Sequence, residues 1–537
     1  MNDNNEKLQY NSCTSKGICS INPRTFALQN VLGLYLNLCA KYSLKLQEKN
    51  ALSQSAKEFI LNTISVSVSN PEFTEEGFVE SITKLKKILP KLIKTYNTIY
   101  NADDFKGEDI LSSDLFKKCE NITDAIKLGE NIYKNKVSNV PVQTRDLLKI
   151  LLIIAKSIGM NILDIESYGT KTDMTEGAFV ILLTILDSLN KEDNDFIKEL
   201  AEEGAKYNTE LMKLLHSEQE KRYGEQVPVK ISYTTTPSKA VLVVGSNIIE
   251  LENILEALKD TDIDVYTHDE MMAAHTFPKF KEYKNLKGQY GHGLENCLID
   301  FATFPGPIIL TKHSLHNVEN FYRGHLFTTD INLCKGVIKI ENNDYREVIS
   351  LANNSKGFKT GKICETVNVG YSYEKCIELI DKKLNSKTYK KVVIIGLKDY
   401  SNEQKEYFEK LVKLLSDEVL IISFSYNFKR DNLLYFNVCF DSFAVVRMAL
   451  YLLGLEPSLS CTFKPLPTDV FLPKCGRNTL AEMIYFAKFP NVAVYMGECN
   501  PIAIDPSMIN TLKNSFKISS INNAKNDSEI VNDLSKY

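Results

Sequence analysis

Residues 240–246 read AVLVVGS, an apolar run rich in β-branched side chains that ends in glycine and serine. It follows the polar stretch EKRYGEQVPVKISYTTTPSK (220–239), which contains two prolines and predicts a linker. Further short apolar runs follow it, with helical patterns between them, and this alternation predicts parallel sheets. The further runs are DVYTH (264–268), IILTKHS (308–314), KVVIIGLK (391–398), VLIISFSY (419–426) and NVAVYMG (491–497).

The residues before this linker have a different period. In EEGFVESITKLKKILPKLIKTY (75–96), apolar side chains recur every three or four residues, the spacing of a helix with one buried face. The same period returns at 25–47, 145–160, 175–189 and 195–216. We therefore expect a helical bundle domain over residues 1–225.

Two α/β domains are expected after the helical part. The stretch NNSKGFKTGKI (353–363) is rich in glycine, lysine and asparagine and predicts a boundary between them. The expected domains are 226–358 and 359–537, the second with a frayed tail from residue 522.

Composition limits the class of protein. A chain of 537 residues with 44% hydrophobic content predicts about two to four domains. A net charge of -4 gives no basic surface for nucleic acid or anionic membranes. The densest apolar stretch, LLKILLIIAKSIG (147–159), is too short to span a bilayer and is interrupted by lysine. We expect a cytoplasmic protein whose twelve cysteines are reduced thiols, metal ligands or core residues.

Several polar residues follow the predicted strands, where open α/β sheets bind ligands. His268, Glu270, His275 and His313 are residue types that hold zinc, iron or manganese. However, HDEMMAAH (268–275) fits no metal signature, so we favour hydrogen-bonded turn and helix-start roles for the histidines.

One cysteine pair precedes the first predicted helix. Cys13 and Cys19 in CTSKGIC are spaced like ligands of an iron-sulfur cluster, although chance surface cysteines fit this spacing equally well.

Longer segments carry a family resemblance. CTSKGICSINPRTFALQNVLGLYL opens the series, and the others follow in this order: YGEQVP, VYTHDEMMAAHTFPKFKEYKNLKGQYG, FATFPGPIILTKHS, FYRGHLFTTD and GECNPIAIDPSMINTLKNSFKI. Together they resemble the hybrid cluster protein family, also called prismane protein or hydroxylamine reductase, from about residue 13 to residue 522. The resemblance is most specific between residues 224 and 338.

The resemblance implies a multidomain α/β fold. A helical N-terminal domain would be followed by two Rossmann-like domains, as in hybrid cluster proteins and carbon monoxide dehydrogenases. It also implies a conventional iron-sulfur cluster near the N-terminus and a hybrid iron-sulfur-oxygen cluster between the domains. In the family the hybrid cluster reduces hydroxylamine to ammonia, and related members reduce nitric oxide.

Most hybrid-cluster ligands of the family are absent from this chain. The family uses one histidine, two glutamates and four cysteines, one of them persulfidated, and two of these ligands are kept here as Glu270 and Cys439. The histidine position falls on Ser246, and three cysteine positions fall on Ser314, Leu397 and Tyr426, with Leu397 at the persulfide position. The second glutamate falls on Lys474, and a shift of one residue would bring Cys475 there instead.

The N-terminal cluster motif is also reduced. Cys13 and Cys19 match the second half of a four-cysteine set whose first half has no counterpart. Two thiolates cannot hold a four-iron cluster alone, although a two-fold dimer could supply two more. We expect no cofactor or a partial iron-sulfur cluster, with no intact hybrid cluster, because serine, leucine and tyrosine do not replace thiolates.

Loss of the metal has a physical consequence for Glu270. A buried carboxylate without metal must be protonated or paired, and Lys474 offers a cation in the same cavity. We therefore predict an ion pair between Glu270 and Lys474, with Leu397 and Tyr426 filling the volume of the cluster.

Three functions fit this sequence. The favoured one is a non-catalytic structural or regulatory protein that forms a homodimer or pairs with an active family member. The alternative is an oxidoreductase acting on hydroxylamine or another N–O compound, with a metal held by Glu270, Cys439, His268, His313 and Cys475. A third, weaker one is the binding of a small organic ligand in the emptied cavity. No nucleic-acid or membrane partner is expected.

Overall fold

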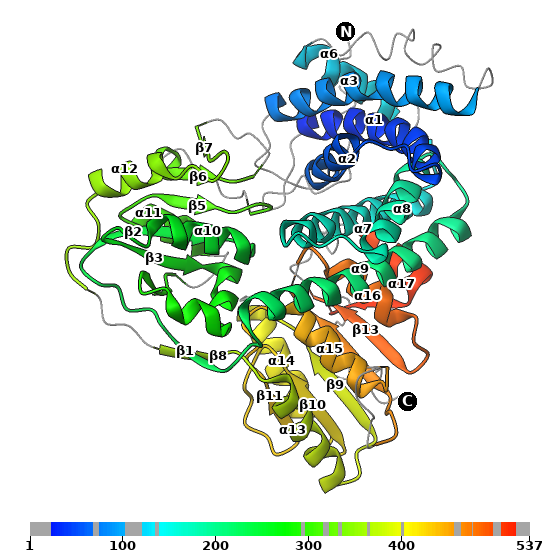
Figure 1. The fold of residues 1–537 in the computed structure, drawn as a ribbon. Helices are drawn as coiled ribbons and strands as arrows, with labels where there is room; N and C mark the ends of the chain where they lie inside the picture. The colour runs from blue at the N-terminus through cyan, green and yellow to red at the C-terminus, as the bar shows by residue number, and fades with distance from the viewer. Residues whose placement is uncertain are drawn as a thin grey trace, which may run out of the picture.

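The computed structural model describes most of the chain. The described residues are 23–67, 75–101, 121–134, 139–291, 296–314, 322–330, 336–361, 366–398, 402–455, 463–474, 476–497 and 506–521. They form helices up to Tyr223 and mixed helices and strands after it (Figure 1). The expected multidomain α/β fold is confirmed at this level, and the boundaries after residues 225 and 358 stay predictions.

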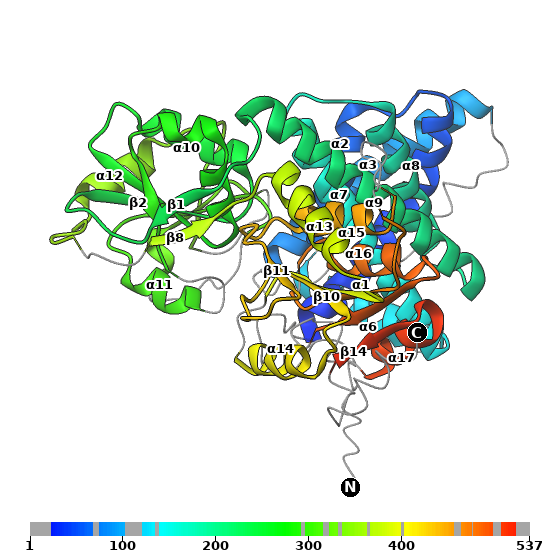
Figure 2. The ribbon, with the colours of Figure 1, turned by 90° about the horizontal axis from the view of Figure 1, so that it is seen from below.

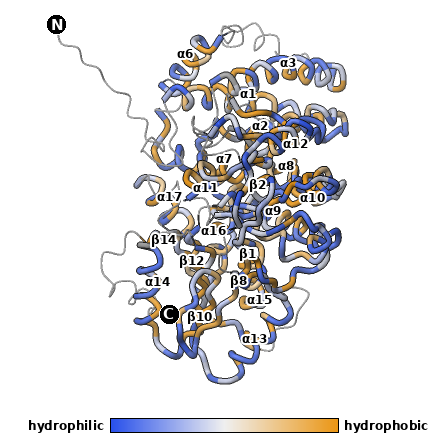
Figure 3. The backbone as a smooth tube through the Cα atoms, turned by 90° about the vertical axis from the view of Figure 1, so that its left-hand side faces the viewer, coloured by the Kyte–Doolittle hydropathy of each residue, from blue (hydrophilic) through white to orange (hydrophobic). Residues whose placement is uncertain are grey.

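The helical part contains long helices around a shared apolar core. Its described helices are α1 (Pro23–Glu48), α2 (Gln54–Ser67), α3 (Glu75–Tyr100), α6 (Ile122–Ile132), α7 (Val142–Ser167), α8 (Asp173–Asp187) and α9 (Asn194–Tyr223). In α3 the buried side chains recur as the sequence predicts, at Phe78, Ile82, Leu85, Leu89 and Leu92. Figure 3 shows the resulting change between hydrophobic and hydrophilic positions along this helix.

The first sheet has six parallel strands in the order β4-β3-β2-β5-β6-β7. This is the strand order of a doubly wound Rossmann sheet. The chain begins such a sheet with a central strand, adds strands toward one edge, and then returns to the centre and adds strands toward the other edge. Its elements are β2 (Lys239–Val244), α10 (Ile248–Leu258), β3 (Ile263–His268), η2 (Asp269–Thr276), η3 (Pro278–Glu282), β4 (Leu286–Gln289), α11 (Cys297–Thr303), β5 (Ile308–Leu310), η5 (Arg323–His325), β6 (Leu326–Thr328), β7 (Ile338–Lys339) and α12 (Arg346–Asn354).

The second sheet repeats this topology, with the order β11-β10-β9-β12-β13-β14. Its elements are α13 (Tyr373–Ser386), β9 (Lys391–Ile395), α14 (Asn402–Leu414), β10 (Val419–Ser423), β11 (Leu433–Tyr435), α15 (Ser442–Leu452), β12 (Thr468–Leu472), α16 (Thr479–Ala487), β13 (Val492–Met496), α17 (Pro506–Phe516) and β14 (Ile518–Ser520). The strands β1 (Val229–Ser232) and β8 (Thr366–Val369) form a small antiparallel pair. In the sequence, β1 precedes the first sheet and β8 lies between the two sheets.

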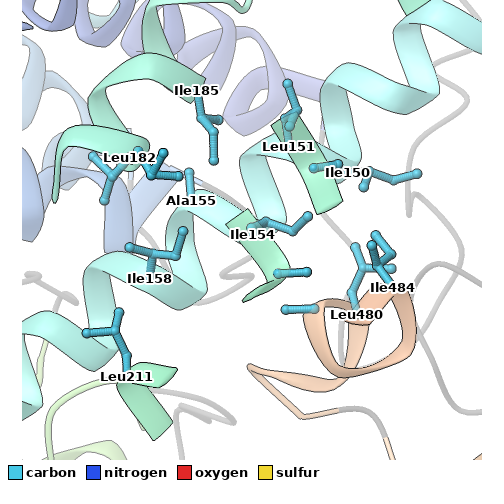
Figure 4. Packing of buried hydrophobic residues seen from close by; sticks show 14 of the residues in the cluster. Ile150, Leu151, Ile154, Ala155, Ile158, Leu182, Ile185, Leu211, Leu480 and Ile484 are labelled. Carbon is cyan, nitrogen blue, oxygen red and sulfur yellow. The ribbon is translucent and has the colours of Figure 1, made fainter. Parts of the chain in front are cut away.

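The helical part and the second sheet share one hydrophobic core. Leu480 and Ile484 of α16 pack among Ile150, Ile154 and neighbouring side chains of α7, α8 and α9 (Figure 4). The first sheet has separate clusters on its two faces and forms a lobe of its own at the left of Figure 2. Contacts between this lobe and the rest of the molecule therefore decide the geometry where the three parts meet.

The crossing of α7 and α9 depends on Gly204. A Cβ atom added at Gly204 would lie 2.8 Å from Ile154 Cγ2, whereas one added at Gly33 in α1 would meet nothing within 4 Å. Isoleucine is stiff at χ1, so α9 would have to move away from α7.

We predict opposite effects of alanine at these two glycines. Gly204→Ala should lower the free energy of unfolding by about 1–3 kcal/mol through overpacking. Gly33→Ala should leave it unchanged or raise it by up to about 1 kcal/mol, because alanine favours helix. Chemical denaturation of both variants measures this, and equal effects would contradict the described crossing.

Candidate functional site

Each sheet reverses its strand order at one point, and residues from both points line one cavity. The reversals lie between β2 and β5 and between β9 and β12. Such points bind ligands in open α/β sheets, beyond the carboxyl ends of the strands. Ser246 follows β2, Leu397 follows β9 and Lys474 follows β12, and all three line a cavity of about 150 Å³. We call it the central cavity; side chains of α7 and α9 close its other side.

An ion pair crosses the central cavity. The Nζ atom of Lys474 donates a hydrogen bond to Oε1 of Glu270, which confirms the predicted pair. The Lys474 side chain is 18% exposed and that of Glu270 is 36% exposed, so water screens the pair in part. The Lys474 ammonium also lies 4.7 Å from the centre of the Phe440 ring. One cation thus connects η2 of the first sheet with the segment after β12 and with the residue before the α15 N-cap.

Backbone strain marks the same site. Asp269, Cys439 and Phe440 have φ angles of 55°, 52° and 66°, in the left-handed region that side chains other than glycine seldom adopt. Such conformations cost of order 1–3 kcal/mol each and persist where the surrounding structure holds them. They turn the chain sharply after β3 and before α15, which brings Glu270 and Phe440 to the central cavity.

Serines occupy the strand-order reversal of the first sheet. Ser246 lines the central cavity, whereas Ser314 is buried and is not among the lining residues. Gly245 has a φ of 122°, and a Cβ atom there would lie 2.1 Å from Oγ of Ser314. The chain therefore passes close to Ser314 at the position where the family resemblance expects metal ligands. The two hydroxyl groups are weak donors for iron compared with imidazole or thiolate.

The expectation that Tyr426 fills the volume of the cluster is wrong, whereas that for Leu397 stays a prediction. Leu397 lines the central cavity, but Tyr426 packs with Phe408 and Phe428 on the hydrophobic cluster that contains Val393. The backbone N–H of Tyr426 donates to Oγ of Ser423, 3.0 Å away, and this local turn directs the tyrosine away from the cavity.

Cys439 lies in an apolar environment. It is 4% exposed and packs with Ile231, Met272 and Val369. Burial raises the pKa of the Cys439 thiol well above its usual range, so the sulfur stays protonated near neutral pH. It lines a second, larger cavity of about 1040 Å³, which shares Leu397 and Phe440 with the central one. Glu270 therefore lines the central cavity and Cys439 lines the larger one, so the two retained ligand positions do not line the same cavity.

The side chains of His268 and His275 are hydrogen-bonded, as expected from the sequence, whereas Nε2 of His313 is not. A ring nitrogen of His268 lies 3.0 Å from Asp300, and one of His275 lies 2.8 Å from the hydroxyl of Thr267. Burial lowers the pKa of His275 to about 4, so its imidazole is neutral at pH 7. His313 is held through its backbone N–H, which donates to Asp330 at 2.8 Å, while its Nε2 has no hydrogen-bond partner in the described structure.

The central cavity does not fit the hybrid cluster. Within the described residues, no group of three or more His, Cys, Asp or Glu side chains is placed to hold a metal ion. Leu397 has no donor atom, and the Lys474 ammonium has no free electron pair and already interacts with the one retained glutamate. Cys13, Cys19 and Cys475 lie outside the described residues.

Sequence reasoning missed several polar residues of the central cavity. Glu482 of α16 is 3% exposed, and burial raises its pKa to about 8, although a hydrogen bond with Ser442 lowers it in part. Asp441 caps α15 by accepting from Ala444 N–H at 3.2 Å, and it accepts the hydroxyl of Tyr371 at 3.0 Å. The sequence signal that could have identified Glu482 was a single carboxylate inside the apolar run TLAEMIYFA (479–487).

Across the described segments, no helix is long and apolar enough to cross a membrane.

Comparisons with known proteins agree with the resemblance in the sequence. The family model described as Prismane/CO dehydrogenase family matches residues 7–527. A hydroxylamine reductase of Thermodesulfovibrio yellowstonii is 24% identical over 540 residues, covering 96% of this chain and 97% of that protein. A hydroxylamine reductase of Acidiphilium cryptum is 25% identical over 532 residues, covering 95% and 94%. Alpha subunits of acetyl-CoA synthase/carbon monoxide dehydrogenase give a TM-score of 0.46 at 10% identity, covering 94% of this chain and 81% of that one, too weak to carry an argument.

A double-mutant cycle measures the ion pair. Glu270→Gln and Lys474→Met should each destabilise the protein, and together they should cost less than the sum of the two. We expect a coupling free energy of about 1–2 kcal/mol, between the values typical of exposed and buried pairs. Additive effects would contradict the pair.

Glu482 predicts a pH dependence of stability. Its pKa in the folded protein, about 8, lies above the ordinary 4.5, so the folded state holds a proton that the unfolded state releases between these values. The stabilisation is complete below pH 4.5 and is lost as pH rises to 8. Compared with Glu482→Gln, the wild type should therefore lose about 2–4 kcal/mol of unfolding free energy between pH 5 and 8.

Chemical denaturation of the wild type and of Glu482→Gln, each measured at several pH values, would show this difference directly. Glu202→Gln serves as the control, because Glu202 lies on α9 outside the cavity lining and pairs with Lys488 at 3.7 Å. Parallel profiles for wild type and Glu482→Gln would show that Glu482 is not held in its protonated form.

Proposed function

The chain belongs to the Prismane/CO dehydrogenase family, and from this premise we propose that it is a member that does not assemble the hybrid cluster. Its role would be non-catalytic, as a structural or regulatory protein that dimerises or pairs with an active family member. The family expected from the sequence resemblance is confirmed; the loss of the cluster and the role are our proposal.

The Glu270–Lys474 ion pair is the observation that carries this proposal. A cluster ligand must offer an electron pair to iron, but the position of the second family glutamate carries Lys474, whose ammonium group offers none and donates a hydrogen bond to Glu270. Leu397 adds an alkyl side chain to the same lining, and Cys439 is a buried thiol in a separate apolar cluster. Iron-sulfur clusters are held by thiolates, and the described lining of the central cavity contains no cysteine.

A second candidate function is reduction of hydroxylamine or another N–O compound. Two observations favour it: relatives named hydroxylamine reductase match over almost the whole chain, and the Nε2 atom of His313 is buried without a hydrogen-bond partner in the described structure. The metal expected from the sequence, held by Glu270, Cys439, His268, His313 and Cys475, would require rearrangement of the ion pair, because Lys474 binds the carboxylate.

Iron and acid-labile sulfide per chain separate the two candidates. The protein is purified without oxygen, reconstituted with iron and sulfide, and examined by visible absorption and for hydroxylamine reduction. The Thermodesulfovibrio yellowstonii hydroxylamine reductase, treated in parallel, is the positive control. We expect no hydroxylamine reduction and no iron beyond what Cys13 and Cys19 can hold.

A variant isolates the N-terminal pair from the central cavity. Cys13→Ser with Cys19→Ser should remove any iron that remains after reconstitution. Near-stoichiometric iron in this double variant, together with turnover of hydroxylamine, would overturn the proposal and favour the reductase.

A further inference from the structure

Three buried oxygen atoms of the central cavity have no hydrogen-bond partner among the described residues, and all three accept hydrogen bonds when Glu482 is ionised. They are Asn161 Oδ1, Gln226 Oε1 and Glu482 Oε1. These residues are 0%, 8% and 3% exposed. Buried polar atoms are nearly always paired, because an unpaired one has lost its hydrogen bonds to water without replacing them. Three such atoms in one lining therefore indicate a bound group that supplies donors.

The orientation of Asn161 is fixed by its neighbours. Its amide nitrogen lies 2.9 Å from Oδ1 of Asn208 and 3.0 Å from Oδ1 of Asn478, and it donates to both. A flipped amide would place its oxygen against these two acceptors, so the amide oxygen remains the unpaired atom. Asn208 also donates to Asn478 at 3.3 Å, which joins α7, α9 and the start of α16 in one rigid wall.

The charges of the lining favour a cation. Four carboxyl groups, Asp164, Glu270, Asp441 and Glu482, face two cations, Lys474 and Arg477. Both cations are already paired, Arg477 with Asp164 at 2.6 Å and Lys474 with Glu270. His216 of α9 is a further titratable side chain in the lining, and its Nδ1 atom lies 3.8 Å from the carboxyl group of Asp441. Glu482 is thus a carboxyl group without a cationic partner of its own, and a positive ligand would stabilise its ionised form.

Helix N-termini at the cavity offer less to an anion than their number suggests. Helices α10 and α15 begin at the lining, but Asn247 and Asp441 cap them by accepting backbone N–H groups at 3.2 Å each. Helix α16 also begins at the lining, at Asn478 and Thr479, and has no side-chain cap, so the preference for a cation rests on the unpaired oxygens and on the excess of carboxyl groups.

We propose that the central cavity binds a small organic cation that carries N–H donors, such as an alkylammonium or guanidinium compound. Its volume of about 150 Å³ matches cavities that hold a molecule the size of benzene, about six non-hydrogen atoms. The ligand donates to Asn161, Gln226 and Glu482 and balances the charge of Glu482. This inference rests on the proposed absence of the hybrid cluster from the same cavity.

Titration calorimetry with the full chain at pH 8 tests the inference with defined probes. Methylguanidinium and ethanolammonium chloride are expected to bind with one site per chain. Tetramethylammonium tests charge without N–H donors, acetamide tests donors without charge, and sodium acetate tests an anion of similar size. We expect these three to bind at least about tenfold more weakly, since each of them lacks the positive charge, the N–H donors or both.

Glu482→Gln keeps the shape of the side chain and removes its charge. It should weaken methylguanidinium binding about tenfold or more, while the matched control Glu202→Gln leaves it unchanged. A thermal-shift comparison of methylguanidinium with tetramethylammonium on the wild type needs no variant. It therefore tests the inference even if Glu482→Gln fails to fold.

The iron content of the same sample shows whether cation binding alone fails or whether the proposed function fails with it. Absence of iron together with absence of cation binding would overturn this inference alone and leave water as the occupant of the cavity. Preference for acetate would overturn it in favour of an anion site. Cluster iron in the cavity would instead overturn the proposed function on which the inference rests.

Discussion

The ion pair between Glu270 and Lys474 is the interaction on which the centre of the molecule depends. The Glu270 side chain is 36% exposed, so water screens the pair in part, and the hydrogen bond from the Lys474 ammonium fixes where the carboxylate lies. Here the partner comes from the segment after β12, more than 200 residues away along the chain. The pair therefore fixes the chemistry of the cavity and also connects the first sheet to the second.

The architecture explains why this connection matters. Helices α7 and α9 share a core with α16 and the second sheet, so these parts behave as one body. The first sheet has its own cores and contacts this body through Asn247, whose amide donates to Asp164 of α7 at 3.2 Å, and through Phe277 and Phe280, which pack against Tyr223 of α9. Left-handed residues at Asp269, Cys439 and Phe440 hold the polar groups in place.

Much of this could be predicted from the sequence, because the responsible signals are local. The buried stripe of α3 follows from helical periodicity, and the strands follow from short β-branched runs. The Glu270–Lys474 pair followed from charge complementarity between two aligned positions. The orientation of Tyr426 could not be predicted, because it depends on a turn closed by Ser423. Glu482 and Asn161 were missed for a similar reason: each is a polar residue beside apolar neighbours in a helix, and only packing shows that the two face one cavity.

Anomalous X-ray diffraction at the iron absorption edge, on crystals grown without oxygen from reconstituted protein, tests the central claim most directly. The account predicts no iron peak in the central cavity and a Lys474 Nζ atom within hydrogen-bond distance of the Glu270 carboxylate. A strong iron peak beside Glu270, with the Lys474 side chain displaced, would contradict it.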